Sequence, residues 1–377
     1  MKNYIIILIF ISVIAGCGGQ KNPEKDSGIN LSKAMGKVKD EKFEKAYDKR
    51  KFIFPEDHGP HPGFRTEWWY FTGNLTTPDN KKFGYQFTVF RTALSSGRKS
   101  GVSEWRSDQI YMAHFTVTDI SNGRFYFDER FSRDGNELAG AQAEPLKVWL
   151  EDWQITESEN RKAFDLPVIS IKAKSDKTEI RLWLESVKPL ILQGNEGLSQ
   201  KGSQPGNASY YYSYTNLKTS GIIITEDREY EVNGKSWMDR EWSTSALSED
   251  QKGWDWFSLQ LDDSTELMYY QMRKKDGTPD KYSSGVIIDK AGLKRQINRE
   301  EADLEVTESR KNSSGIEYPS GWNLKIPSEK IELKIIPAVR DQFLDVTVKY
   351  WEGSVTVKGK KNNTDISGRG YAELTGY

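Results

Sequence analysis

From Phe52 to the C-terminus, short runs of aromatic and β-branched residues alternate with turns rich in Gly, Asn, Asp and Pro, and helix signals are scarce. Aromatic and β-branched residues favour strands, and Asn122-Gly123 between two apolar runs is a strong hairpin signal. Many short antiparallel strands with tight turns form sandwiches or barrels. About seventeen such strands are too many for one small barrel of roughly eight. We therefore expect an all-β chain with two antiparallel β-barrels in series.

The boundary between the two barrels is predicted near Asn233, which gives a first barrel at residues 52–233 and a second at residues 234–377. Residues 190–209 are rich in Gly and also contain Pro, which is loop composition. This segment is either the linker between the barrels or a long loop over a barrel mouth, of the kind that often carries function.

The first residues resemble a bacterial lipoprotein signal. A positive residue, Lys2, precedes the short apolar run 4–15, and Ile14-Ala15-Gly16-Cys17 resembles a lipobox. The single Cys of the chain stands where that motif needs it. The resemblance implies a signal peptide at residues 1–16, a lipid anchor on Cys17 and a polar tether at residues 17–51. The alternative is an ordinary secretory signal with an unrelated Cys.

Charge and composition exclude several classes of protein. The 54 Lys and Arg residues against 55 Asp and Glu residues give a net charge of −1, which argues against a nucleic-acid partner. One Cys rules out a disulfide framework and a zinc-thiolate site, and a multi-His metal site would need nearly all three His. We find no phosphate-binding Gly-rich motif and no Gly-x-Ser-x-Gly motif. We therefore expect no cofactor and no bound metal.

Two of the candidate site segments contain the histidines. Asp57, His58 and His61 could hold a divalent ion, or they could belong to a turn-rich entry segment whose His side chains bond to backbone. Glu67 follows, directly before Trp68-Trp69-Tyr70. His114 faces away from Ala113 and Phe115 if this segment is a strand. It is then either an acid/base candidate in a barrel lumen or a core His satisfied by a hydrogen bond.

Two further segments combine carboxylates with Trp. In the predicted strand 234–242, Trp237, Asp239 and Glu241 share one face, and Met238, Arg240 and Trp242 share the other. Two neighbouring carboxylates raise the pKa of one of them, which suits acid/base chemistry, although a surface ladder of ion pairs is the alternative. Trp254 and Trp256 share a face of the next strand, and Tyr269 follows. These aromatic residues are either core packing or the wall of an apolar ligand site.

Several motifs together resemble the superfamily of AttH-like proteins and carotenoid 1,2-hydratases (hydroxyneurosporene synthases), often called predicted secreted hydrolases. The motifs are His58-Gly59-Pro60-His61, Glu67-Trp68-Trp69-Tyr70 with Thr72-Gly73, Phe83-Gly84-Tyr85-Gln86-Phe87-Thr88 with Phe90-Arg91, Ala113-His114, Tyr211-Tyr212-Ser213, Trp237-Met238-Asp239-Arg240-Glu241-Trp242, Gly253-Trp254-Asp255-Trp256-Phe257, Tyr350-Trp351-Glu352-Gly353 and Gly370-Tyr371-Ala372-Glu373-Leu374-Thr375-Gly376-Tyr377. The resemblance covers about residue 52 to the C-terminus and implies two lipocalin-like barrels.

The sequence departs from the carotenoid hydratases at two positions. Aligned with them, Arg240 stands where they have His, and Gln271 stands where they have Asp. An alkene hydratase needs an acid that can protonate a double bond, and neither Arg nor Gln can do so at neutral pH. We therefore do not extend the resemblance to carotenoid hydration.

Three functions follow from these features. The first is an envelope lipoprotein that binds an apolar lipid or isoprenoid. The second is a hydratase, cyclase or hydrolase acting on such a ligand, and the third is a purely structural interaction protein. An acid with a raised pKa in an enclosed apolar pocket would favour the enzyme, and an entirely apolar lumen would favour the binding protein. No oligomeric state follows from the sequence.

The candidate site is predicted at the junction of the two barrels, since ligand sites favour domain interfaces and barrel mouths. The candidate catalytic residues are Asp239, Glu241, His114, Glu67 and Tyr269. The candidate ligand-binding residues are Trp68, Trp69, Tyr70, Trp237, Trp242, Trp254 and Trp256. A competing interpretation is that Arg240 pairs with Glu67 or Glu241 as a structural salt bridge.

If Cys17 is the lipid anchor, Cys17→Ser should move the protein from the membrane fraction to the soluble envelope fraction, because no acyl chains would then hold it. In a cell with two membranes, Gly18 after the Cys implies the outer membrane, facing the periplasm. Fractionation followed by immunoblotting measures the change. Membrane attachment that persists in the variant would contradict the anchor.

Overall fold

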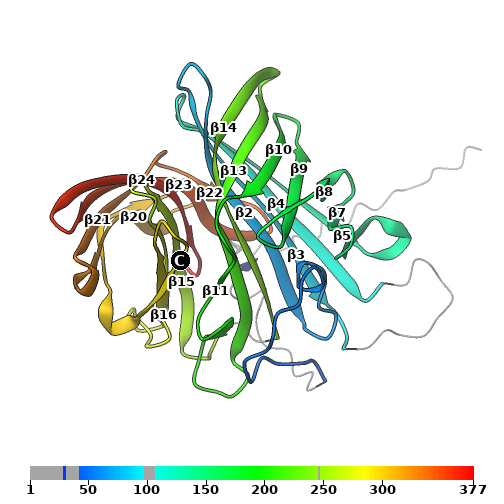
Figure 1. Cartoon of the computed structure of the whole chain (residues 1–377), viewed down its shortest axis with the longest axis horizontal. Coiled ribbons are helices and arrows are strands. Elements are labelled where there is room, and N and C mark those ends of the chain that lie inside the picture. Colours follow the sequence, from blue (N-terminus) through cyan, green and yellow to red (C-terminus); the bar gives the residue numbers. More distant parts are fainter. Residues whose placement is uncertain (1–28, 31–41, 97–106, 245–246) are drawn as a thin grey trace, which may run out of the picture.

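The computed structural model describes residues 29–30, 42–96, 107–244 and 247–377 of the chain. These residues form two sheets, antiparallel except for the parallel pairing of the two-residue β1 with β23, and four short 3-10 turns, and they contain no α-helix. The first sheet has 13 strands and the second has 11. Figure 1 shows the two sheets side by side, each curled around its own interior. The all-β prediction is confirmed.

The first sheet has the strand order β5-β4-β3-β2-β14-β13-β10-β9-β8-β7-β6, and β11 and β12 also pair with β13. Its strands are β2 (Thr66–Thr76), β3 (Lys82–Ala93), β4 (Gln109–Asp119), β5 (Arg124–Arg133), β6 (Ala139–Gln142), β7 (Lys147–Leu150), β8 (Trp153–Ala163), β9 (Leu166–Lys174), β10 (Thr178–Ser186), β11 (Ile191–Leu192), β12 (Leu198–Gln200), β13 (Ala208–Thr225) and β14 (Arg228–Ser243). The sheet curls until its edge strand β5 contacts β7.

The second sheet has the order β18-β17-β16-β15-β24-β23-β21-β20-β19, and β1 and β22 also pair with β23. Its strands are β1 (Ile29–Asn30), β15 (Gln251–Leu261), β16 (Glu266–Lys274), β17 (Ser284–Ile288), β18 (Lys294–Asn298), β19 (Asp303–Lys311), β20 (Glu317–Ile326), β21 (Ile331–Pro337), β22 (Phe343–Leu344), β23 (Val348–Lys361) and β24 (Thr364–Leu374). The 3-10 turns are η1 (Glu56–His58), η2 (Gly135–Glu137), η3 (Arg299–Glu301) and η4 (Pro327–Glu329).

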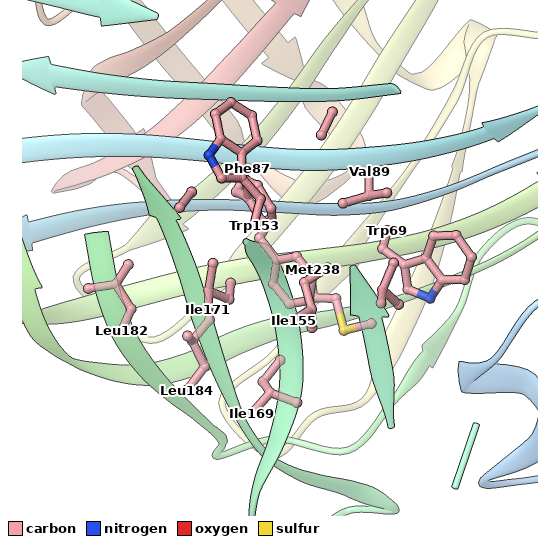
Figure 2. Close-up of a cluster of buried hydrophobic side chains, with 14 of the residues drawn as sticks. Trp69, Phe87, Val89, Trp153, Ile155, Ile169, Ile171, Leu182, Leu184 and Met238 are labelled. Carbon is pink, nitrogen blue, oxygen red and sulfur yellow. The ribbon is translucent and has the colours of Figure 1, made fainter. Parts of the chain in front are cut away.

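Each sheet encloses its own hydrophobic core. Figure 2 shows part of the first core, where Trp69 of β2, Met238 of β14 and Ile155 of β8 point into the same space. The second core is built around Phe257, Trp322 and other side chains of β15 to β24. Side chains alternate between the two faces of a strand, so every second residue of these strands points away from its core.

The change from the first sheet to the second falls later than the sequence predicted. β14 runs without interruption from Arg228 to Ser243 and pairs with both β2 and β13. A boundary at Asn233 would therefore cut a single strand, and residues 234–243 belong to the first sheet. The chain passes to β15 only after Ser243.

The predicted tether also differs from the structure at its end. Phe43 and Ala46 are buried, and the side chain of Tyr210 donates a hydrogen bond to the carbonyl of Asp48. The residues just before Phe52 therefore pack against the first sheet instead of standing free in solvent. The lipobox and Cys17 lie outside the described residues. No helix in the described part of the chain is long and apolar enough to cross a membrane.

The outer faces of the two sheets pack closely against each other. Asn74 of β2 donates to the carbonyl of Gly370 on β24 and accepts from Ser354 of β23, at 3.1 and 2.6 Å. A Cβ at Gly84 would lie 2.7 Å from the Tyr371 hydroxyl and 2.8 Å from Cβ of Ser354. Glycine is therefore required at this position for the second sheet to approach β3.

A buried ion pair also joins the two halves. Lys188, which follows β10, donates to Oε2 of Glu266 on β16 at 2.5 Å and to the carbonyls of Ser264 and Asp289. The two side chains are 8% and 0% exposed. A carboxylate this deeply buried needs its partner, because an unpaired buried charge is strongly destabilising.

Lys188→Met should lower the free energy of unfolding by about 3 kcal/mol, because it leaves Glu266 buried with only the Asn216 amide as a donor. The double variant Lys188→Met/Glu266→Gln should recover most of the loss. Urea denaturation measures both. As a control, Lys311→Met breaks an exposed pair with Glu317 and should cost no more than about 0.5 kcal/mol. Equal losses for Lys188→Met and Lys311→Met would contradict this role of Lys188.

Candidate functional site

A pocket lies where the outer faces of the two sheets meet. Its cavity volume is about 80 Å³, within about 750 Å³ of space not filled by atoms that includes open solvent. The first sheet and its loops supply Trp68, Tyr70, Phe90, Lys201, Ser209, Tyr211, Asp239, Glu241 and Ser243, and the second sheet supplies Trp254, Trp256, Tyr270, Met272 and Glu373. Seven of these 14 lining residues are aromatic and six are Lys, Ser, Asp or Glu, so the pocket combines apolar walls with several polar groups, as small-molecule sites do.

Strand alternation explains which predicted residues reach the pocket. In the antiparallel register of β2 and β14, Tyr70 lies opposite Asp239 and Trp68 lies opposite Glu241. These four side chains point outward from the first sheet, toward the second. Trp237 is on the same face, next to Trp256, and donates its indole N–H to Asp239 at 2.7 Å.

Asp239 is a buried carboxylate held by three donors. The hydroxyls of Ser213 and Tyr211 donate to it at 2.5 and 2.6 Å, in addition to the indole of Trp237. Burial raises the pKa of Asp239 to about 7, although these three hydrogen bonds favour the ionised form. Near neutral pH, Asp239 can therefore gain or lose a proton.

Glu241 is held by two polar contacts with other residues of the first sheet and its loops. It accepts a hydrogen bond from Ser209 at 2.5 Å, and its Oε1 lies 3.3 Å from Nζ of Lys201. Lys201 follows β12, within the Gly-rich segment 190–209. That segment pairs with β13 through β11 and β12, so it is a loop of the first sheet that contributes to the pocket and does not link the two sheets.

The second sheet contributes a pair of glutamates. Glu352 of β23 and Glu373 of β24 lie directly opposite each other in the strand register, and each carboxyl shifts the pKa of the other. Glu352 is fully buried and accepts from the Tyr70 hydroxyl at 2.9 Å, and Glu373 accepts from the Trp254 indole at 2.6 Å. Glu373 lines the pocket, and Glu352 lies behind it.

These two glutamates are not both ionised at neutral pH. Two ionised carboxylates buried side by side would repel each other, and Oε2 of Glu352 has no hydrogen-bond donor among the described residues. Burial, and then the neighbouring Glu373, raise the pKa of Glu352 well above its usual range. Burial also raises the pKa of Glu373 to about 7. Glu352 is therefore protonated at neutral pH, and Glu373 gains or loses its proton near pH 7, so the two groups titrate as a pair.

Three other predicted residues lie on the opposite face of the same strands, inside the first sheet. Glu67 is buried in ion pairs with Arg91 and Arg240, and the Arg240 guanidinium lies 3.9 Å from the ring centre of Trp69. Trp242 stacks on His61. Burial alone would raise the pKa of Glu67, but Arg240 and Arg91 hold it well below its usual range. The structure therefore has the Arg240–Glu67 salt bridge that the sequence offered as the competing interpretation.

The histidines also have structural partners. The ring nitrogens of His61 contact the carboxylates of Asp57 and Glu67, at 3.0 and 3.2 Å. Nδ1 of His58 contacts the Tyr212 hydroxyl at 2.8 Å. In the described part of the chain, no group of three His, Cys, Asp or Glu side chains is placed to hold a metal ion.

His114 and Tyr269 do not line the pocket. His114 points out of the first core toward the second sheet and contacts the Tyr350 hydroxyl at 2.8 Å, so it does not face a lumen. Burial lowers the pKa of His114 to about 3, which keeps it neutral. Tyr269 points into the second core, and burial raises its pKa to about 12.

Sequence reasoning missed several polar groups of this site, among them Lys201, Tyr211, Glu352 and Glu373. Tyr211, Glu352 and Glu373 stand in motifs that carry the family resemblance. The alternation of side chains along one strand does not by itself place them in the site. Glu352 and Glu373 are 21 positions apart, and only the pairing of β23 with β24 brings them together. Strand register across a long hairpin was the missing information.

Comparison with known proteins agrees with this architecture. A sequence model of the AttH-like family matches residues 45–377, and the chain therefore belongs to the AttH-like family. The crystal structure of an AttH protein from Nitrosomonas europaea is similar over 89% of this chain and 100% of that chain, with 33% identity and a TM-score of 0.78. This likeness agrees with the predicted lipocalin-like fold.

A more distant likeness is to kievitone hydratase from Nectria haematococca. It covers 89% of this chain and 98% of that chain, with 15% identity and a TM-score of 0.65. At this identity, the likeness shows the fold alone. A comparison with curated proteins gave no match.

Glu373→Gln should stabilise the protein at high pH. A pKa raised in the folded state means that the folded protein binds the proton more tightly, so stability is lost as the pH rises through about 7. Gln cannot ionise and can still accept from Trp254. We expect a gain of about 1–3 kcal/mol at pH 8.5 and almost none at pH 5, measured by urea denaturation. A gain that is the same at both pH values would contradict a buried, protonated pair.

Proposed function

We propose that this AttH-like protein is an enzyme that uses carboxylate acid–base chemistry on an apolar, unsaturated ligand, adding water to a double bond or removing it. One observation carries this proposal. Glu373, whose pKa is raised to about 7 and which lies opposite the buried Glu352, opens onto a pocket in which half of the lining residues are aromatic. A pure binding site would gain nothing from a buried acid, because burying ionisable groups costs stability.

The two sides of the pocket supply different roles. Glu373, backed by Glu352, is the acid that delivers a proton to the double bond of the ligand. Asp239, which accepts three hydrogen bonds, is the base that removes a proton from the attacking water. The two groups are close enough for Asp239 to raise the pKa of Glu373. In the addition, a C–H bond and a C–O bond form, the double bond is lost, and the proton taken from water returns to Glu373.

The aromatic walls support this chemistry. Protonation of a double bond produces a carbocation, and the faces of Trp and Tyr rings stabilise a positive charge. Trp68, Trp254 and Trp256 surround the carboxylates from both sheets. Kievitone hydratase, by its name, is a hydratase on the same type of fold.

The second candidate function is a lipid-binding lipoprotein without turnover. The apolar pocket supports it, and so does the lipobox, which would place the protein at an envelope membrane through Cys17. In that case the protein should release an intact lipid or isoprenoid on extraction with organic solvent, as seen by mass spectrometry of purified protein.

The test uses squalene, geranylgeraniol and farnesylamine as probes in D₂O. The wild-type enzyme should transfer deuterium to carbon, with or without addition of the elements of water, and mass spectrometry detects both. Glu373→Gln should lose at least about 100-fold of this rate, because removal of a general acid typically costs 10²–10⁴-fold. The rate should peak near pH 7, since Glu373 must be protonated and Asp239 ionised.

One control variant and one further test variant complete this experiment. Glu308→Gln removes an exposed carboxylate of the second sheet and should keep the full rate. Glu352→Gln keeps the shape of the pair and should shift the pH at which the rate is highest, because Glu373 then titrates without its neighbouring acid. An unchanged rate in Glu373→Gln would remove this residue from the mechanism and favour the binding function.

A further inference from the structure

The pocket already contains an ammonium group. Nζ of Lys201 lies 3.3 Å from Oε1 of Glu241, 4.3 Å from the ring centre of Tyr270 and 5.2 Å from that of Tyr211. Its side chain is only 13% exposed. A carboxylate and two aromatic faces around a cation are the arrangement by which proteins recognise amines and quaternary ammonium groups.

The other charges of the pocket are negative. Asp239, Glu241 and Glu373 line it, and Lys201 is the one Lys or Arg among its described lining residues. An anion entering this space would meet carboxylates with little water to screen them, whereas a cation would be attracted.

The direction of the pKa shifts agrees with this charge balance. Burial alone would lower the pKa of Lys201, but Glu241 and its other neighbours outweigh burial and raise the pKa. The pKa values of Asp239 and Glu373 are raised as well. All three shifts favour the more positive form of the group.

The position of Lys201 on a loop also allows its ammonium group to move out of the pocket. It follows the short strand β12 on the loop 201–207, where its backbone N–H bonds to the carbonyl of Asn207. The Lys side chain is a flexible four-carbon stem with a point charge. The ammonium can therefore withdraw from the pocket by rotation of its side chain, without any change in the strands that hold Tyr211, Tyr270 and Glu241.

We propose that Glu241, Tyr211 and Tyr270 form a subsite for a cationic group, in which the Lys201 ammonium occupies the place that the amine or quaternary ammonium end of an apolar ligand takes. The proposal deepens the proposed function, since it rests on the same pocket and names the ligand class as apolar molecules with a positive end. The opposite assignment is that Lys201 anchors the carboxylate of an acidic lipid.

Three probes with the same chain separate these assignments: dodecyltrimethylammonium, dodecanol and dodecanoate, each below its micelle concentration. Binding is followed by quenching of Trp fluorescence at pH 7.5. The wild-type protein should bind the cation at least as tightly as the alcohol, and the alcohol roughly tenfold or more tighter than the anion. Lys201→Ala should tighten binding of the cation by roughly tenfold, because the subsite is then empty. Lys358→Ala, which removes an exposed Lys of β23, should change nothing.

The outcomes that overturn the proposal are specific. Dodecanoate binding as tightly as the cation, with that binding lost in Lys201→Ala, would make Lys201 an anion anchor. Cation binding that is absent or unchanged in Lys201→Ala would also overturn it. Thermal unfolding of the variant without probe shows whether it is folded. None of these measurements needs turnover, so they remain decisive even if the deuterium-transfer test of the enzyme fails.

Discussion

Both faces of strand β2 and of residues 236–243 of β14 are buried, and the rest of the structure depends on this constraint. Their inner faces carry Glu67 and Arg240 in a buried ion network within the first core, and their outer faces meet the second sheet. In a single barrel, this outer face would be exposed to solvent, and its carboxylates would be hydrated and keep pKa values near the usual ones. Because the second sheet covers it, Asp239 needs donors from Ser213 and Tyr211, and the chain provides them.

The packing of the second sheet against the first also explains why Glu352 and Glu373 have raised pKa values. Even-numbered residues of β23, from Tyr350 to Ser354, point away from the second core and toward the first sheet, where there is little water. Glu352 and Glu373 therefore reach the interface together, and their charges cannot both be tolerated there. Keeping Glu352 protonated is the lower-energy solution. An acid that is kept protonated in this way, next to an apolar pocket, is available to react.

The fold was largely predictable because it depends on local patterns. Period-two alternation placed Trp237, Asp239 and Glu241 on one face and Met238, Arg240 and Trp242 on the other, as the structure shows. The same rule separated Trp254 and Trp256 from Phe257. Alternation does not say which of the two faces is the core, and this is why Glu67 and Asp239, both candidates by composition, lie on opposite sides of the first sheet.

Contacts between distant segments could not be predicted in this way. The place of Lys201 depends on a loop that folds back onto β13, and the glutamate pair depends on the register between β23 and β24. The boundary near Asn233 was wrong for a similar reason. A 16-residue strand such as β14 contains Asn233-Gly234, which has the composition of a turn, but pairing with β2 and β13 on both sides keeps the strand extended.

The central claim is that Glu352 is protonated beside Glu373 at neutral pH, and infrared difference spectroscopy tests it most directly. The spectrum of the wild-type protein minus that of Glu352→Gln at pH 7 should contain the C=O stretching band of a protonated carboxylic acid. The band should shift to lower frequency in D₂O. A difference spectrum with only the bands of ionised carboxylates would contradict the account, because the pocket would then have no acid held ready by its neighbour.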